Sequence, residues 1–232
     1  MKSIGFDTGP IISLVTNNLL WIIEHLKRKY KGRFFITPAV KHELIDRPLM
    51  TKRFEFEAFQ VSQLIRKGIL EVIDNPNVKA MKNKLINWAN NAFKARGRWL
   101  NIVSDAEIEV LAADAILDAE ATVIDERTAR MLLENPGRLT NLLEKKLHCR
   151  INSNKENIKN FQNQLKDVQI IRSTELVTIA YKMGLLDDYL VKKSKLVKNP
   201  KKRLLDAALW AVKVRGCSVS KSEIDEIVRR EV

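Results

Sequence analysis

Short apolar runs alternate along the chain with segments in which apolar residues recur every three or four positions. The runs at 3–6, 34–36, 121–124 and 168–171 are typical of buried strands in a parallel sheet, and 69–73 is a fifth candidate. Helical spacing follows at 11–30, 105–117, 174–186, 203–215 and, after Ser220, in a short final helix. Strands that alternate with helices predict an α/β fold, namely a three-layer α/β/α sandwich with a mostly parallel central sheet.

Two segments interrupt this alternation and are interpreted as insertions. The first, 77–101, is basic with interleaved aromatics, and the second, 138–166, is rich in Lys and Asn and only weakly apolar. No internal repeat and no linker rich in Gly, Ser or Pro divides the sequence. We therefore expect a single domain over 1–232, with a helical extension at 203–232.

The chain is strongly basic, and its net charge indicates what kind of partner it binds. Lys and Arg number 41 against 28 Asp and Glu, which gives a net charge of +13 and a pI of about 9.8. Such a balance favours a polyanionic partner, most often nucleic acid, over the alternative of a Lys-rich solvated surface. We find no apolar run long enough to cross a membrane and no secretory signal, and the two cysteines lie far apart. We therefore expect a cytoplasmic protein with reduced thiols and no membrane partner.

Acidic residues follow the predicted strands at the places where the strands end. Asp7 comes directly after the first run, Asp125 after the third, and Glu43 lies on the helix that follows the second. The carboxyl ends of parallel strands meet at one edge of the sheet, where ligands bind in such folds. Carboxylates gathered there repel one another unless a cation such as Mg²⁺ neutralises them. An acidic metal pocket in a basic protein favours a nuclease, although Asp7 would also suit the N-cap of a helix.

Four segments that carry these acids occur in order along the chain. They are 4–12 (IGFDTGPII), 36–43 (ITPAVKHE), 104–112 (SDAEIEVLA) and 122–127 (TVIDER). Together they resemble the PIN-domain nucleases. The resemblance implies a PIN-like sheet order of 3-2-1-4-5 and a ribonuclease that depends on Mg²⁺ or Mn²⁺. It further implies catalytic and metal-binding roles for Asp7, Glu43, Glu107 and Asp125, with Asp105 as the alternative metal ligand to Glu107. Gly9 departs from the family pattern, which often has Ser at this place.

Two interpretations of the third acidic position stay open. Ser104 followed by Glu107 is a capping-box pattern, so Glu107 is a candidate for a structural role as well as for a ligand. Asp105 would also serve as a favourable charge in the first helical turn. Two residues apart on a helix, the side chains of Asp105 and Glu107 point about 200° apart, so only one of them faces the pocket squarely.

The expected function is that of a metal-dependent endoribonuclease that hydrolyses single-stranded RNA with one or two Mg²⁺ or Mn²⁺ ions. The residues expected to bind RNA are Lys94, Arg96, Arg98, Trp99 and Arg127. For the segment 88–99 the alternative is a helix whose aromatics pack on the core. The alternative function is a catalytically inactive RNA-binding module or scaffold. A homodimer, or a small inhibitory partner if the protein is toxin-like, completes the hypotheses about partners.

Overall fold

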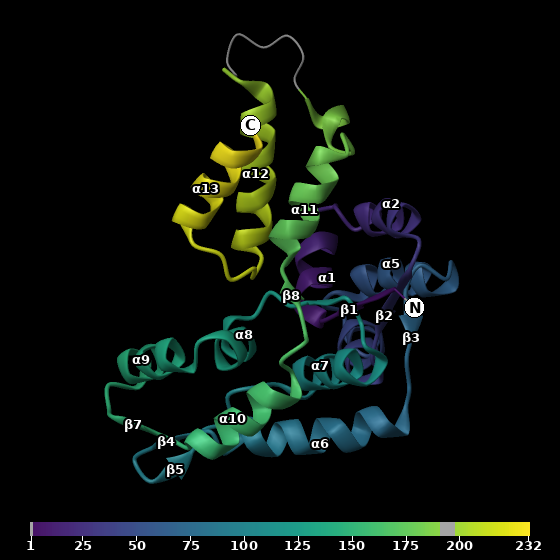
Figure 1. Cartoon of the computed structure of the whole chain (residues 1–232). Coiled ribbons are helices and arrows are strands. Elements are labelled where there is room, and N and C mark those ends of the chain that lie inside the picture. The colour runs from purple at the N-terminus through teal and green to yellow at the C-terminus, as the bar shows by residue number, and fades with distance from the viewer. Residues whose placement is uncertain (1, 191–197) are drawn as a thin grey trace.

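The computed structural model of the chain (Figure 1) describes residues 2–190 and 198–232. Its centre is a five-stranded sheet in the order β3-β2-β1-β6-β8, and every neighbouring pair is parallel. The strands are β1 (Ser3–Phe6), β2 (Arg33–Ile36), β3 (Glu71–Val72), β6 (Ala121–Val123) and β8 (Ile170–Ile171). All five predicted strands are confirmed, and counted along the chain they stand in the order 3-2-1-4-5.

Side chains alternate between the two faces of the sheet and bury a hydrophobic core on each. Phe34 and Ile36 of β2 pack in one core, whereas Phe35 between them packs in the other. The first core is covered by α1 (Thr8–Val15), α2 (Trp21–Tyr30), α11 (Ser173–Lys182), α12 (Pro200–Val214) and α13 (Lys221–Glu231), and the second by α6 (Pro76–Asn90) and α7 (Asp105–Leu117). Helices on both sides of the strands (Figure 1) make the arrangement compatible with a three-layer sandwich.

Several short elements lie between β2 and β3, and one follows α11. They are α3 (Pro38–Lys41), the π-helical turn η1 (His42–Asp46), α4 (Arg47–Leu49), α5 (Glu55–Arg66) and the 3₁₀ turn η2 (Asp187–Tyr189). None of the described helices combines the length and the apolar character that are needed to cross a bilayer.

The prediction of one helix over 11–30 is wrong. The chain forms α1 and α2 instead, and the residues between them turn at Asn18, whose φ is 55°. Asparagine tolerates this left-handed conformation better than most residues. The side chain of Asn17 donates to the backbone oxygens of Ser13 and Ala211, at 2.7 and 3.2 Å, and so ties the turn to α12. Polar side chains at these two positions therefore end the first helix although the apolar spacing continues.

The two basic insertions join in a small antiparallel sheet that the sequence did not predict. β4 (Phe93–Ala95) pairs on one side with β5 (Arg98–Trp99) and on the other with β7 (Ile151–Ser153). The surrounding helices are α8 (Arg127–Glu134), α9 (Pro136–Leu147) and α10 (Lys155–Gln164). Strands of two or three residues show too little alternation to be recognised, so only the structure reveals that the insertions form one unit.

Candidate acidic site

Asp7 both caps a helix and presents a free carboxylate oxygen. It follows β1, and its backbone N–H donates to the backbone oxygen of Val123 at 3.0 Å, which fixes it at the sheet edge. Its Oδ2 accepts a hydrogen bond of 3.4 Å from the backbone N–H of Gly9, as an N-cap residue does. Among the described residues, its Oδ1 is the one buried side-chain oxygen or nitrogen that has no hydrogen-bond partner. Buried polar atoms are rarely left in this state, so Oδ1 is open to a further partner.

Glu43 lies on η1 and is held beside the start of α1. Its Oε2 accepts a hydrogen bond of 2.7 Å from Oγ1 of Thr8. The short helix before it, α3, is anchored by Glu109, whose Oε1 accepts from the backbone N–H of Ala39 at 3.0 Å. Lys82 in turn binds the other oxygen of Glu109 at 2.7 Å. This buried contact between α6, α7 and α3 fixes the turn that carries Glu43.

Glu107 faces the site, whereas Asp105 does not. Glu107 is 7% exposed and completes the predicted capping box, accepting from the backbone N–H of Ser104 at 2.9 Å. The side chain of Asp105 is 63% exposed and binds Lys82 at 2.8 Å, beside Glu109. The capping and pocket interpretations of Glu107 are therefore compatible, while Asp105 belongs to a separate ion-pair network.

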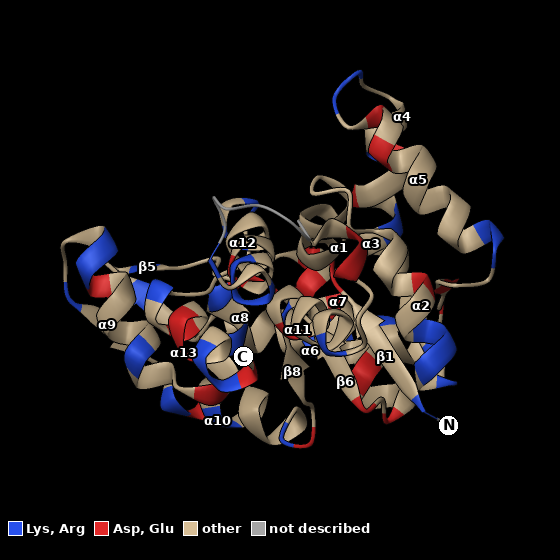
Figure 2. Ribbon diagram, turned by 90° about the horizontal axis from the view of Figure 1, so that it is seen from above, with Lys and Arg blue, Asp and Glu red and all other residues tan. Residues whose placement is uncertain are grey.

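The carboxylates around Asp7 oppose one another's ionisation. Burial and the charges of Glu107 and Glu43 raise the pKa of Asp7 to about 7, although the backbone N–H groups of Thr8 and Gly9 act against the rise. Burial also raises the pKa of Glu107, to which the charges of Glu126 and Glu43 contribute. Figure 2 shows acidic segments gathered where α1, α3 and α7 meet, and many Lys and Arg residues over α8, α9 and α10. The site is thus a local concentration of negative charge in a basic protein.

Asp125 lies close to Asp7, but its carboxylate accepts hydrogen bonds from two serines. Ser173 donates to it twice at 2.8 Å, from its backbone N–H and from Oγ, and Ser13 donates from Oγ at 3.1 Å. A methyl group built at Gly9 would lie 3.5 Å from Cβ of Asp125 and 3.6 Å from Oδ2 of Asp7, so Gly9 separates the two acids. Both oxygens of Asp125 already accept hydrogen bonds, which distinguishes it from Asp7.

The segment before α13 also packs on Asp125, a contact that the sequence did not predict. The backbone N–H of Ser218 donates to the backbone oxygen of Asp125 at 3.0 Å. Cys217 is buried beside the same residue, and burial together with the charge of Asp125 raises the pKa of its thiol to about 12. The helical extension therefore forms part of the surroundings of the site. Contacts between residues so far apart in the chain leave no local pattern that could have revealed them.

The residues present suit a hard divalent cation. Asp7, Glu43 and Glu107 offer carboxylate oxygens, the ligands that Mg²⁺ and Mn²⁺ prefer. A cation would supply a partner for Oδ1 of Asp7 and would offset the burial and the like charges that raise the pKa of Asp7. Within residues 2–190 and 198–232, no three His, Cys, Asp or Glu side chains lie close enough together to hold a metal ion. The chemistry of the donors fits the ion, and binding it would require the carboxylates to draw closer.

The predicted RNA-binding residues 94–99 lie on the small sheet of the insertions. Lys94 stands over the ring of Trp99, with Nζ 5.2 Å from the ring centroid, and Trp99 is 45% exposed. Arg96 and Gly97, with φ of 47° and 81°, turn the β4–β5 hairpin, and Arg96 and Arg98 are exposed. By contrast, Phe93 is fully buried, so one aromatic of this segment packs on the core while another stays on the surface. The alternative of a helix packed on the core therefore holds for part of this segment, while RNA binding by its exposed residues stays a prediction.

Arg127 lies apart from the hairpin, at the start of α8. Its Nε donates to Oγ of Ser218 at 3.0 Å. Since Ser218 also contacts Asp125, Arg127 stands next to the acidic site rather than on the basic hairpin.

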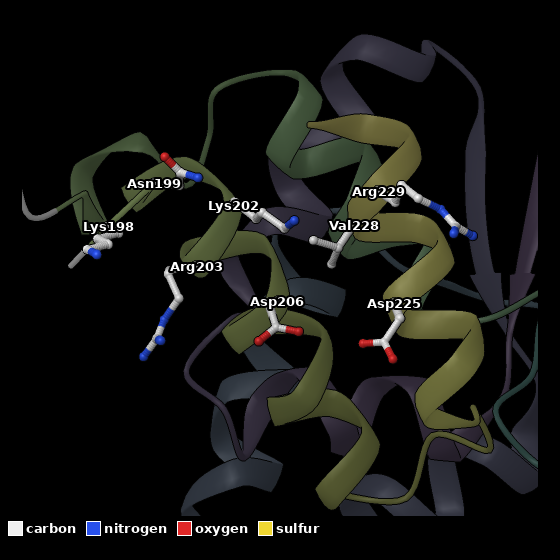
Figure 3. A pocket seen from close by; sticks show the side chains of 8 residues that line it. All are labelled: Lys198, Asn199, Lys202, Arg203, Asp206, Asp225, Val228 and Arg229. Carbon is white, nitrogen blue, oxygen red and sulfur yellow. The ribbon is translucent and has the colours of Figure 1, made fainter.

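A hollow of about 500 Å³ between α12 and α13 is separate from all of these residues (Figure 3). Lys198, Lys202, Arg203 and Arg229 line it together with Asp206 and Asp225, which extend from opposite walls. None of the residues predicted from the sequence lines it. Its mixed charge indicates no particular ligand.

Comparison of the chain with protein-family models, with curated protein sequences and with solved structures found no match. The function is therefore argued from the geometry and chemistry of the acidic site.

Proposed function

We propose that the protein is a metal-dependent endoribonuclease of the PIN-like type, which hydrolyses phosphodiester bonds of single-stranded RNA. The observation that carries the proposal is the buried, unpartnered Oδ1 of Asp7 at the carboxyl edge of a parallel sheet, on a residue whose pKa is raised by burial and by the charges of Glu107 and Glu43. Such an arrangement is costly in the absence of a cation, and sites with strongly perturbed pKa values are often functional. The parallel strand order 3-2-1-4-5 is the one that the resemblance implies, and it supports the proposal.

Each acidic residue has a distinct task in this proposal. Asp7, Glu43 and Glu107 would hold the ion, and Asp125 would hold α1 and α11 in place through the hydrogen bonds that it accepts from Ser13 and Ser173. When bound, Mg²⁺ or Mn²⁺ supplies an activated water and neutralises charge on the phosphodiester. Hydrolysis of this kind leaves a 5′-phosphate and a 3′-hydroxyl. Thr8 keeps the carboxylate of Glu43 directed to the site.

The basic surface supplies the affinity for RNA. A net charge of +13 attracts the phosphate backbone. Trp99 offers an exposed ring on which a base can stack, and Lys94, Arg96 and Arg98 surround it with positive charge. Stacking on aromatic rings requires unpaired bases, which favours single-stranded RNA over a duplex.

The decisive experiment compares the full chain with its Asp7→Asn variant on labelled single-stranded RNA in the presence of Mn²⁺. We expect the wild type to cut and Asp7→Asn to lose activity, because the amide cannot replace the anionic oxygen. Asp118→Asn is the matched control, since Asp118 is exposed at the C-cap of α7 in a conformation that Asn tolerates. Equal cleavage by Asp7→Asn and the wild type would show that the acidic site is not catalytic.

The second candidate is an RNA-binding module without catalysis. It is favoured by Asp125, because both carboxylate oxygens of this residue already accept hydrogen bonds from Ser13 and Ser173 and neither is left for a metal ion. Calorimetric titration with Mn²⁺ separates the two candidates. Binding that is lost in Asp7→Asn supports the nuclease, whereas a wild type that binds RNA but neither binds Mn²⁺ nor cuts supports the module.

A further inference from the structure

A cavity of about 350 Å³ lies between α8, the start of α9 and the segment 218–223. Three arginines line it, Arg127, Arg130 and Arg138, and three serines, Ser218, Ser220 and Ser222. The arginines come from α8 and the start of α9, and the serines come from the helical extension. Segments about 90 residues apart in the chain, as in the bond between Arg127 and Ser218, therefore build one polar cavity.

The positive charge of the cavity is only partly neutralised. Glu223 is at its edge, but Arg172 binds that carboxylate at 2.8 Å. Although burial acts in the opposite direction, hydrogen bonds from Ser220 and the Arg172 guanidinium lower the pKa of Glu223 to about 2, so it is already paired. Glu134 stands 3.9 Å from Nε of Arg130. Within the described part of the chain, Arg127 and Arg138 have no carboxylate within salt-bridge distance.

The cavity adjoins the acidic site. Arg127 is two residues beyond Asp125, and Glu126 between them contributes to the raised pKa of Glu107. Ser218 connects the two places, because its backbone N–H binds Asp125 while its Oγ accepts from Arg127 at 3.0 Å. Its backbone oxygen also accepts from Nη2 of Arg130 at 3.5 Å. A ligand held by the arginines would thus lie beside the segment that carries Asp125 and Glu126.

We propose that this cavity binds a phosphate group of the RNA strand on which the acidic site acts, an inference that rests on the proposed function. Guanidinium groups and hydroxyls together are the donors that bind phosphate oxygens best, since arginine offers planar, paired N–H groups. The phosphate is either an internal one or the 5′-terminal one. Segment 218–223 of the helical extension then forms a wall of the substrate-binding surface.

The test measures RNA binding by the full chain without divalent ions, so that cleavage does not interfere. Two short single-stranded RNAs of one sequence are used, one with a 5′-phosphate and one with a 5′-hydroxyl. The variant is Arg127→Gln with Arg138→Gln, because both side chains are exposed and their replacement removes no ion pair of the described chain. Arg66→Gln is the matched control, since Arg66 is exposed at the end of α5.

We expect the double variant to bind RNA about ten-fold more weakly, and the slope of log affinity against log salt to decrease by about 0.7 for each phosphate that is no longer bound. Arg66→Gln should keep both values. Replacing the same pair by Lys should restore the salt slope but not the full affinity, because an ammonium group lacks the paired N–H groups. Weakening confined to the 5′-phosphorylated RNA assigns the cavity to the terminal phosphate, and equal weakening for both RNAs assigns it to an internal one.

Two results would overturn the inference. One is a double variant that binds both RNAs like the wild type with an unchanged salt slope, and the other is a wild type that binds neither RNA. Cleavage with Mn²⁺ is scored separately. A wild type that binds through the arginines but does not cut contradicts the ribonuclease and leaves the phosphate cavity in place, whereas variants that bind and cut normally contradict the cavity alone.

Discussion

Thr8 donates a hydrogen bond of 2.7 Å from Oγ1 to Oε2 of Glu43. The donor is the first residue of α1, directly after Asp7, and the acceptor lies on the π-helical turn η1 after β2. π-Helical turns are rare in proteins, and those that occur often lie at functional sites. The bond therefore ties the ends of two neighbouring strands together and sets the carboxylate of Glu43 close enough to Asp7 for its charge to raise the pKa of Asp7.

Removing this bond is expected to weaken the site without unfolding the protein. Thr8→Val keeps the branched shape but cannot donate, so the carboxylate of Glu43 is no longer oriented. We expect about ten-fold slower cleavage of single-stranded RNA and a free energy of unfolding lower by about 1 kcal/mol. Thr140→Val is the control, since its hydroxyl bonds only the backbone oxygen of Pro136 on α9. Equal cleavage rates for Thr8→Val and the wild type would show that this orientation is unimportant.

Glu107 and Asp105 offer a matched pair for assigning the third acidic position. Glu107→Gln keeps the capping box, in which Gln also serves, and removes only the charge next to Asp7. Asp105→Asn removes a charge of the Lys82 network instead. Mutations of residues that only support metal ligands lower metal affinity by roughly 10–100-fold. We expect Glu107→Gln to lower the Mn²⁺ affinity by at least this factor, and Asp105→Asn to bind Mn²⁺ like the wild type. Calorimetric titration measures both, and the reverse order of effects would assign the position to Asp105.

The central sheet could be predicted from the sequence because its three middle strands, β1, β2 and β6, are largely buried. Such strands are continuous apolar runs, and Asp7 and Asp125 mark their ends. The capping box at Ser104 could also be predicted, since it depends on two residues three positions apart. Features that depend on local spacing could therefore be predicted, including the order of α7 and β6 along the chain.

The neighbours of the acids could not be predicted, because they come from distant segments. Ser13 and Ser173 bind Asp125, and nothing in the residues around either serine indicates a partner. Gly9 offers no hydroxyl beside Asp125, and these two serines bring hydroxyl groups to that carboxylate from α1 and α11 instead. The break after α1 escapes prediction for a different reason, since the bond of Asn17 to Ala211 depends on a helix nearly two hundred residues later.

The pH dependence of stability should reveal the raised pKa of Asp7, which burial causes first and the charges of Glu107 and Glu43 increase. Its pKa is raised from 3.8 to about 7 in the folded chain, so between these values the folded state binds the proton more tightly than the unfolded state does. Stability is consequently lost as the pH rises from about 4 to about 7, by on the order of 4 kcal/mol for this group. Without divalent ions, the free energy of unfolding of the wild type should fall through this range relative to that of Asp7→Asn.

Urea unfolding at pH 5 and pH 8, each with EDTA or with Mn²⁺, measures this difference. Mn²⁺ should stabilise the wild type at pH 8, because the ion binds the ionised carboxylate and not the unfolded chain, and should leave Asp7→Asn unchanged. Parallel pH profiles of the wild type and the variant would contradict the raised pKa of Asp7.

Trp99 is expected to contribute to RNA affinity by stacking rather than by charge. Trp99→Ala removes an exposed ring from the basic hairpin, at a cost of about 1–3 kcal/mol per stacked base, or roughly ten-fold or more in affinity. The matched control is Phe56→Ala, an aromatic side chain that is 72% exposed on α5. Since every phosphate stays bound, the salt dependence of binding should remain that of the wild type, unlike that of the arginine pair at the cavity. Fluorescence anisotropy across a salt series separates the two effects, and a reduced salt slope in Trp99→Ala would mean that the ring acts by placing Lys94 on a phosphate.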